Sequence, residues 1–254
     1  MAERTFKLCI SIFCCLFLLT TPVVGQDKKR DKKKDNPNDT IIYPLFDGIS
    51  IGYDILGPIN KAYNKKYLTH EISIDVSLKN RYFPVLELGY GSANKWSDHG
   101  IHYKSKAPYF RIGADYNFFH KKAHKHILSL GFRYGYSSFD YDIKNLPLDD
   151  DVWGNDVIEN PSINDDIWGG SISLDKTRLS SSMHWLEFVL GVRTSIYKNL
   201  QMAITFRMKY RVSIERNPHG DPWYIPGFGN YDNSRAGINY SIIYRIPGSK
   251  RKVK

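Results

Sequence analysis

The segment EISIDVSL, from Glu71 to Leu78, alternates polar and apolar side chains without a break. A period of two residues predicts a β-strand, because successive side chains of a strand point to opposite faces of the sheet. The isoleucines of this segment share one face, and Glu71 and Asp75 lie on the other. The pattern does not say which face meets water. A soluble barrel would turn the isoleucines inward, whereas a membrane barrel would turn them outward to lipid.

Seven further segments of the chain show the same alternation. They span residues 49–55, 86–91, 110–118, 128–136, 186–193, 202–211 and 237–246. Short connections are predicted at 79–81, 120–125 and 197–199, and long ones at 57–69, 92–107, 137–183 and 213–235. Turns at one end and long loops at the other are typical of outer-membrane barrels, whose tilted strands need about 9–11 residues to cross the bilayer. We therefore predict an all-β fold: an eight-stranded antiparallel up-and-down transmembrane β-barrel with short periplasmic turns and four long extracellular loops.

The two faces of these strands differ in bulk and in charge. The apolar set is rich in Phe, Tyr, Leu and Ile, and it would overfill the narrow interior of an eight-stranded barrel. The opposite set carries glycines and nearly balanced acids and bases, which suits a poorly hydrated interior, because an unpaired buried charge costs about 3–5 kcal/mol. We therefore predict that the isoleucines face lipid and that ion pairs fill the interior. The predicted interior charges are Asp54, Glu71, Asp75, Glu87, Asp115, Glu187, Arg111, Arg133, Arg193, Arg207, Lys209, Arg211 and Arg245.

The two ends of the chain differ from the barrel in composition. Residues 1–25 are predicted to be a secretory signal peptide, since basic residues precede an apolar run from Leu8 to Leu19 that is too short to span a bilayer as a helix. All 3 cysteines lie in this segment, so we expect neither a disulfide nor a thiolate metal site in the mature chain. We predict a charged periplasmic segment at 26–44, the barrel at 45–248 and a basic tail at 249–254. Most of the formal charge of +10 gathers in these ends, which is typical of solvated arms and argues against nucleic-acid binding.

Four stretches of the chain resemble a known protein family. They are HYKSKAPYFRIGADYNF (His102–Phe118), RYGYSSFDYD (Arg133–Asp142), WLEFVLGVR (Trp185–Arg193) and DPWYIPGFGN (Asp221–Asn230). The family is an uncharacterised group of outer-membrane β-barrel proteins from Bacteroidota, catalogued as a domain of unknown function, and the likeness runs from about Pro44 to Pro247. The resemblance implies the fold and the outer-membrane location. It transfers no activity and no catalytic residue.

The long connection over residues 137–183 is rich in carboxylates, and DDVWG at Asp150–Gly154 is nearly repeated at 165–169. Carboxylate oxygens are the ligands that Ca²⁺ prefers, so a loose Ca²⁺ site is one hypothesis. The spacing is not that of a recognised calcium loop, and we favour an acidic surface loop instead. The candidate Ca²⁺ ligands are Asp149, Asp150, Asp151, Asp165 and Asp166.

Three histidines, His120, His124 and His126, lie close together in a predicted turn. Lysines flank them, and their positive charge would repel a metal cation. We therefore expect a solvated basic turn rather than a metal site.

A group of residues near the predicted outer rim raises an enzymatic alternative. Ser181, Ser182 and His184 are followed by Glu187, and some small outer-membrane barrels deacylate or transfer lipid chains. By strand parity His184 faces lipid and Glu187 faces the interior, which separates the members of a Ser–His–acid triad. We therefore predict no catalytic residue and no cofactor, and keep a lipid acyl hydrolase or transferase as an alternative. A second alternative is a soluble lipocalin-like carrier of apolar ligands.

Eight strands leave no room for an aqueous pore once charged side chains fill the interior. We predict a non-enzymatic protein of the cell outer membrane, monomeric and surrounded by lipid, that acts in envelope integrity or surface interaction. An extracellular ligand or surface partner would bind the loops at 137–183 and 213–235. We expect the most exposed parts of these loops to be the acidic segment and the aromatic residues Trp223, Tyr224 and Phe228.

Overall fold

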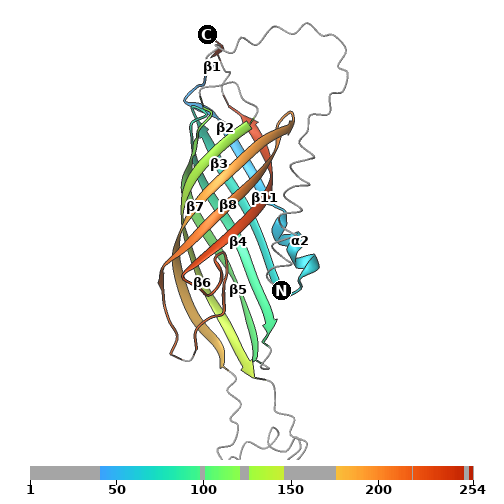
Figure 1. Ribbon diagram of the computed structural model, residues 1–254, viewed down its shortest axis with the longest axis vertical. Helices are drawn as coiled ribbons and strands as arrows, with labels where there is room; N and C mark the ends of the chain where they lie inside the picture. Colours follow the sequence, from blue (N-terminus) through green and yellow to red (C-terminus); the bar gives the residue numbers. More distant parts are fainter. Residues whose placement is uncertain are drawn as a thin grey trace, which may run out of the picture. The chain divides into compact units, whose positions relative to one another are not determined.

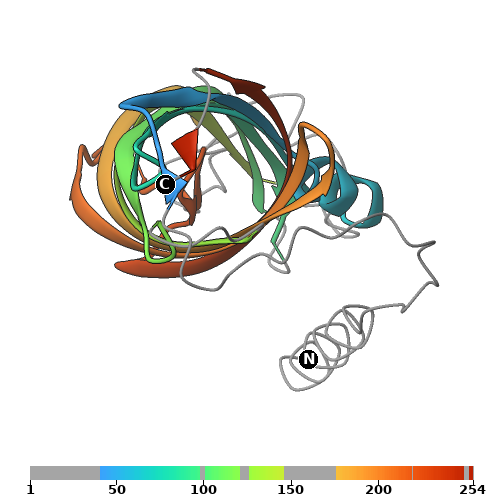
Figure 2. The same cartoon turned by 90° about the horizontal axis from the view of Figure 1, so that it is seen from above.

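The computed structural model describes residues 41–97, 101–120, 126–145, 176–218, 220–248 and 252–253. Eight antiparallel strands close into a barrel in the order β11-β2-β3-β4-β5-β6-β7-β8 (Figures 1 and 2). Barrel strands that follow one another in the chain are paired, and β11 pairs with β2 to close the ring. The predicted up-and-down barrel is confirmed. The strands are β2 (Phe46–Asp54), β3 (Tyr67–Leu78), β4 (Tyr82–Trp96), β5 (Ile101–Asn117), β6 (His126–Asn145), β7 (Lys176–Tyr197), β8 (Leu200–Ile214) and β11 (Ser234–Pro247).

Smaller elements complete the described part of the chain. Helix α2 (Leu56–Tyr63) lies between β2 and β3, and a hairpin of β9 (Tyr224–Ile225) and β10 (Gly229–Asn230) lies between β8 and β11. Two short strands, β1 (Ile41–Ile42) and β12 (Lys252–Val253), pair with each other. No helix within the described residues is both long and apolar enough to cross a membrane.

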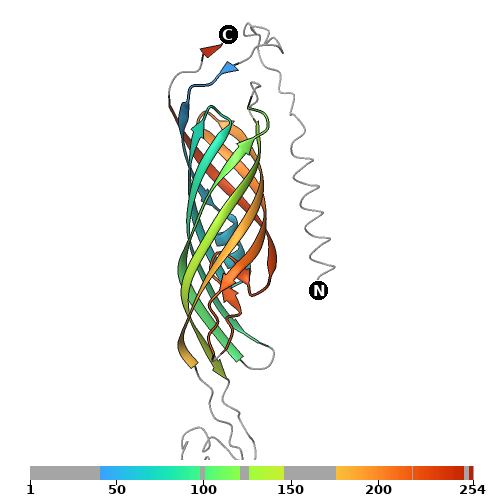
Figure 3. The same cartoon turned by 90° about the vertical axis from the view of Figure 1, so that its left-hand side faces the viewer.

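The apolar faces of the strands point away from the barrel axis. Ile72 is 50% exposed, Leu130 is 49% exposed and Phe206 is 43% exposed, whereas Glu71 beside Ile72 is 4% exposed. Aromatic pairs join neighbouring strands on this outer surface, among them Phe132 and Phe188, whose ring centroids are 5.5 Å apart. The outward direction of the isoleucines is therefore the one predicted for a membrane barrel, and these apolar side chains form an outer band. Figure 3 shows the tilt of the strands that carry the band.

Strands β4, β5, β6 and β7 continue beyond this apolar band. Their side chains keep the same in-and-out alternation, but the outward residues are now polar and the inward ones apolar. On β5 the outward residues become Lys104 and Lys106, while Tyr103 and Ala107 turn inward and are buried. On β6 Phe139 and Tyr141 are likewise buried inside the barrel. Above the band the outer surface meets water, so the barrel there follows the rule of a soluble protein, with polar groups outside and apolar groups inside.

This switch of polarity corrects two predicted loops. Much of the segment predicted as a loop at 92–107 belongs to β4, which ends at Trp96, and to β5, which begins at Ile101. The loop predicted at 137–183 is shortened at both ends, because β6 ends at Asn145 and β7 begins at Lys176. The sequence prediction recognises a strand by its apolar outer face, and that face ends where the membrane band ends. It therefore misses the parts of the strands that lie above the band.

The connection at 57–69 is also not a simple loop. Strand β2 ends at Asp54, so the ladder between β11 and β2 reaches only to Ser241 opposite Asp54. The carboxylate of Asp54 accepts hydrogen bonds from the backbone N–H of Tyr240 at 3.1 Å and from the N–H of Leu56 at 3.3 Å. The chain then turns out of the sheet into α2, beside the barrel wall (Figure 1). The Ile55 N–H still donates to the Tyr240 carbonyl at 2.9 Å, and the Asp54 side chain accepts from the Tyr240 N–H that a longer β2 would have bonded.

Candidate functional site at the loop end of the barrel

The middle of the barrel is filled by an ionic cluster that we define as Glu71, Glu87, Glu187, Arg111 and Arg207. Arg207 Nη1 on β8 lies 2.6 Å from Glu87 Oε2 on β4 and 3.1 Å from Glu187 Oε2 on β7. Arg111 Nη1 on β5 lies 2.6 Å from Glu71 Oε2 on β3 and 3.0 Å from Glu87 Oε2. Each of the five side chains is at most 5% exposed. The cluster spans the barrel from wall to wall, which leaves its members no bulk water and makes each pair depend on the others.

Further ion pairs surround the cluster. Arg133 Nη1 lies 2.7 Å from Asp115 Oδ1, and Arg133 Nε lies 3.3 Å from Glu87 Oε1, so Arg133 extends the network to β6. Arg193 Nη2 lies 2.8 Å from Asp75 Oδ2. Toward the turn end Arg245 pairs with Asp47, a partner that the predicted set of interior charges does not include.

Three of the predicted interior charges have neutral partners instead of opposite charges. Besides its backbone contacts, Asp54 accepts a hydrogen bond of 3.0 Å from Asn239 Nδ2. Arg211 donates to Asn233 Oδ1 at the loop end, where water replaces membrane. Lys209 Nζ donates to the carbonyl oxygens of Gly227 at 2.6 Å and Phe228 at 3.3 Å. The partners of Arg211 and Lys209 lie in the β8–β11 connection, which the strand pattern alone does not place.

The β9–β10 hairpin with its tip, residues 224–230, folds into the mouth of the barrel. Tyr224 is 8% exposed, Ile225 is 0% exposed and Phe228 is 2% exposed. They pack against inward aromatic residues of the upper strands, such as Trp185, whose ring centroid is 6.0 Å from that of Phe228. The expectation that this aromatic segment is exposed is therefore wrong for Tyr224 and Phe228, because the apolar inner wall above the band provides a place to bury them.

The ionic cluster holds this hairpin from below. Arg111 Nη2 donates to the Gly227 carbonyl at 2.9 Å, beside the bond from Lys209. Gly227 has a φ of +83°, and a Cβ placed there would lie 2.5 Å from the ring of Tyr109, so both the conformation and the space call for glycine. From the wall, Tyr103 Oη donates to the Tyr224 carbonyl at 2.8 Å. The hairpin is thus fixed by buried, charge-assisted hydrogen bonds as well as by packing.

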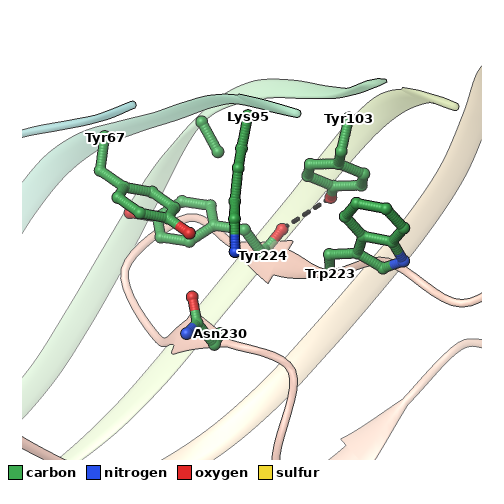
Figure 4. Close-up of a pocket in the computed structure, with 7 residues that line it drawn as sticks. Tyr67, Lys95, Tyr103, Trp223, Tyr224 and Asn230 are labelled. Atoms are coloured by element: carbon green, nitrogen blue, oxygen red, sulfur yellow. Dashed lines mark hydrogen bonds between the residues drawn. The ribbon is translucent and has the colours of Figure 1, made fainter. Parts of the chain in front are cut away.

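An aromatic pocket of about 180 Å³ remains above the hairpin (Figure 4). The rings of Tyr103 and Trp223 stack with centroids 5.6 Å apart, and those of Tyr67 and Tyr224 are 5.2 Å apart. Burial raises the pKa of the Tyr224 hydroxyl above its ordinary value, so this wall stays neutral at physiological pH. The residues that line the pocket are Tyr67, Ala93, Lys95, Tyr103, Trp223, Tyr224 and Asn230.

Lys95, Tyr67 and Tyr103 are not among the candidate site residues from the sequence. All of them lie in segments predicted as long loops, at 57–69 and 92–107. The signal that could have found Tyr103 is the alternation in HYKSKA, residues 102–107, where strand parity continues although the apolar face has changed sides.

The residues considered for lipid hydrolysis are not brought together. His184 bonds to the Tyr134 hydroxyl, and Ser182 Oγ donates to Glu215 Oε2 at 3.2 Å. Ser181 Oγ donates to the Glu215 carbonyl at 2.7 Å. Glu187 faces the interior, where Trp185 Nε1 donates to it at 2.7 Å. Ser181, Ser182, His184 and Glu187 therefore do not bond to one another in this structure.

The metal hypotheses have different outcomes. The candidate Ca²⁺ ligands Asp149, Asp150, Asp151, Asp165 and Asp166 and His124 lie outside the described residues, as do the predicted signal peptide and most of both charged ends. His120 Nδ1 is 3.0 Å from the Asn117 carbonyl, and His126 Nδ1 is 2.8 Å from Thr194 Oγ1. Within the described ranges no group of three His, Cys, Asp or Glu residues is arranged to hold a metal ion.

Comparison with known proteins gives a family match and several similar structures. Residues 5–251 match the profile of a family described as Domain of unknown function (DUF6048). No curated protein sequence matches the chain. The crystal structure of Neisserial surface protein A is similar with a TM-score of 0.39 and 13% identity, over 79% of this chain and 95% of that one. Ail, the attachment invasion locus protein of Yersinia pestis, gives a TM-score of 0.39 and 10% identity over 79% and 98% of the two chains. A major outer membrane protein from Thermus thermophilus gives a TM-score of 0.39 and 12% identity, again over 79% and 98% of the two chains.

Proposed function

The chain belongs to the family described as Domain of unknown function (DUF6048), and we propose that it is a non-enzymatic outer-membrane protein that interacts with the cell's surroundings through the loop end of its barrel. The lumen is closed twice, by the ionic cluster and by the buried hairpin above it. A closed lumen does not support transport of solutes, so contact at the exposed end is the activity that the geometry supports best. The single observation that carries this proposal is the hairpin anchored in the barrel mouth by Lys209 and Arg111.

The proposal has further parts that rest on the sequence pattern and, for the species, on the family resemblance. The signal peptide at 1–25 directs export, and the barrel is a monomer in the outer membrane, in a species of the Bacteroidota. The basic ends at 28–34 and 250–254 contact anionic lipid headgroups or cell-wall polymer. Loss of envelope retention on deleting the basic residues of both ends supports that contact, and unchanged retention rejects it.

Cysteine labelling tests the orientation directly, because all 3 native cysteines lie in the predicted signal peptide. Asp232→Cys places a thiol beside the hairpin, and Tyr197→Cys places one at the turn end, where Tyr197 is 63% exposed. In intact cells a membrane-impermeant maleimide is expected to label Asp232→Cys and to label Tyr197→Cys only after the outer membrane is permeabilised. The reverse pattern contradicts the proposal.

Conductance in planar bilayers tests the closed lumen. The full chain purified from outer membranes is expected to show no steady current, since charged side chains and the hairpin fill the cross-section. A steady open pore in the wild-type protein would mean that the interior is a channel and that the proposed role is wrong.

A further inference from the structure

We infer that the aromatic pocket binds one ring of an acidic sugar, with the ring against Trp223 and Tyr224 and its carboxylate at Lys95. The inference rests on the proposed function, since it gives a ligand to the loop end. The cavity of about 180 Å³ is smaller than the roughly 300–1,000 Å³ of sites for drug-sized ligands. It therefore suits a single ring at the end of a larger molecule rather than a folded peptide or an acyl chain.

The charge of the pocket selects an anion. Lys95 is the one charged residue among the described residues that line the pocket, and its ammonium group has no hydrogen-bond or ion-pair partner within the described part of the chain. Figure 4 shows the Lys95 side chain pointing into the pocket toward Tyr224 and Asn230. An aromatic box without this lysine would favour a cationic ligand, but the ammonium group repels one. A carboxylate would supply the missing partner in a charge-assisted hydrogen bond.

The remaining walls favour a sugar over a flat aromatic acid. The hydroxyl of Tyr67 and the side-chain amide of Asn230 have no hydrogen-bond partner within the described residues, and both groups border the same space as Lys95 (Figure 4). A benzene ring would cover these polar groups without pairing them, which carries a free-energy penalty. A sugar ring offers C–H groups to the aromatic faces of Trp223 and Tyr224 and hydroxyls to the polar groups.

The pocket is built before a ligand arrives. Tyr224 and Asn230 are paired across the hairpin, and the hairpin is held by Lys209, Arg111 and Tyr103. Trp223 is positioned by its stack on Tyr103. A site whose walls are already ordered loses little conformational entropy on binding, so even one ring can bind measurably.

The test uses the full chain purified from outer membranes in detergent and ligand-observed NMR titrations. The probes are glucuronate, glucose as its neutral match and benzoate as an aromatic carboxylate. We expect glucuronate to bind, and glucose and benzoate to bind about tenfold more weakly or less, because each lacks one set of contacts. Lys95→Met should weaken glucuronate binding about tenfold and leave the weak binding of glucose unchanged. Lys104→Met, which removes an outward lysine from β5, is the matched control and should leave glucuronate binding unchanged.

The following results would each reject the inference. Equal binding of glucose and glucuronate, or unchanged glucuronate binding by Lys95→Met, removes the role of the carboxylate. Benzoate that binds as tightly as glucuronate removes the sugar. A wild-type protein that is folded, as its shift in gel migration on boiling would show, and yet does not bind glucuronate rejects the inference. In that case correct labelling of Asp232→Cys leaves the proposed function standing. Reversed labelling rejects the proposed function whatever the titrations show.

Discussion

Arg207 on β8 reaches across the interior to Glu87 on β4, and its Nη1 atom lies 2.6 Å from Glu87 Oε2. The same guanidinium contacts Glu71 and Glu187, so it neutralises carboxylates from three strands. Arg207→Leu leaves these groups without one of their two central cations. We expect the free energy of unfolding to fall by about 3–5 kcal/mol, the usual result of breaking a buried ion pair.

Urea titration of the protein in lipid vesicles would measure this loss. Lys104→Leu is the control, because it removes a charge from the exposed outer surface and should change the free energy of unfolding by no more than about 0.5 kcal/mol. Equal effects of the two substitutions would show that the ionic cluster contributes no more to stability than a surface charge does.

Lys209→Met is expected to loosen the hairpin while leaving the barrel closed. The substitution removes both hydrogen bonds from Nζ to the Gly227 and Phe228 carbonyls, and bonds to a charged group contribute about 1.5–3 kcal/mol. Hydrogen exchange of residues 224–230 should therefore accelerate, whereas exchange in β4 to β7 should stay slow. Lys198→Met, in an exposed turn, serves as the control; slow hairpin exchange in both variants would show that packing alone holds the hairpin.

Alanine substitution should have opposite effects on the free energy of unfolding at two glycines that face the interior. A Cβ at Gly89 would lie 2.1 Å from Cζ of Tyr109, so Gly89→Ala forces the ring to move and should cost about 1–3 kcal/mol. A Cβ at Gly237 would meet nothing closer than Lys209 Cε at 3.7 Å. Gly237→Ala should therefore leave the free energy of unfolding equal or raise it by about 0.4–1 kcal/mol. Denaturation in vesicles compares the two, and a Gly237→Ala variant as unstable as Gly89→Ala would contradict the space seen here.

Arginine substitutions should locate the membrane band. Phe206→Arg places a charge among outward apolar side chains and should cost about 2–4 kcal/mol, the value for the bilayer midplane. Ser138→Arg lies on β6 beyond Tyr136, where the outer surface is polar, and should cost about 0–1 kcal/mol. Unfolding in vesicles of defined lipid gives both values. If both substitutions were tolerated alike, the apolar band would not be in lipid.

Alkaline pH should release the hairpin. Burial raises the pKa of Tyr224 above its ordinary value, so the folded hairpin favours the neutral hydroxyl. Its contribution is complete below a pH of about 10, where the exposed hydroxyl is also neutral, and is lost as pH rises through the folded pKa. Tryptophan fluorescence from about pH 9 to 12 should report the release, and Tyr224→Phe should shift it to higher pH. A release at the same pH in the variant would assign it to another group.

The eight strands and their lipid-facing side could be predicted because both follow from local alternation and from volume. Ile72 and Phe206 face outward as their parity and bulk require. The length of the strands could not be predicted by the same rule. Tyr103 and Tyr141 continue the parity but belong to a part of the wall that meets water, so an apolar outer face is the wrong criterion there.

The candidate site could be predicted only in part, for a different reason. The charged residues of the cluster follow from parity, and their pairing follows from the cost of burying a charge. The hairpin depends on contacts between residues far apart in the chain, such as Arg111 with Gly227. An aromatic loop has the same composition whether it binds a partner or fills its own barrel. Composition alone favours an exposed binding loop, so the burial of this hairpin could not be predicted from it.

The early end of β2 has a consequence for how the cylinder comes together. The β11–β2 ladder stops at Ser241 opposite Asp54, whereas β6 and β7 are paired from His126 opposite Thr194 to Ile143 opposite Lys176. The first and last strands of the barrel to leave the ribosome therefore share a short joint, sealed at its upper limit by the Asp54 carboxylate and by one backbone hydrogen bond from Ile55 to Tyr240. Both ladders of β2 are short, so we expect the cylinder to close last at this strand during insertion and to part there first under tension.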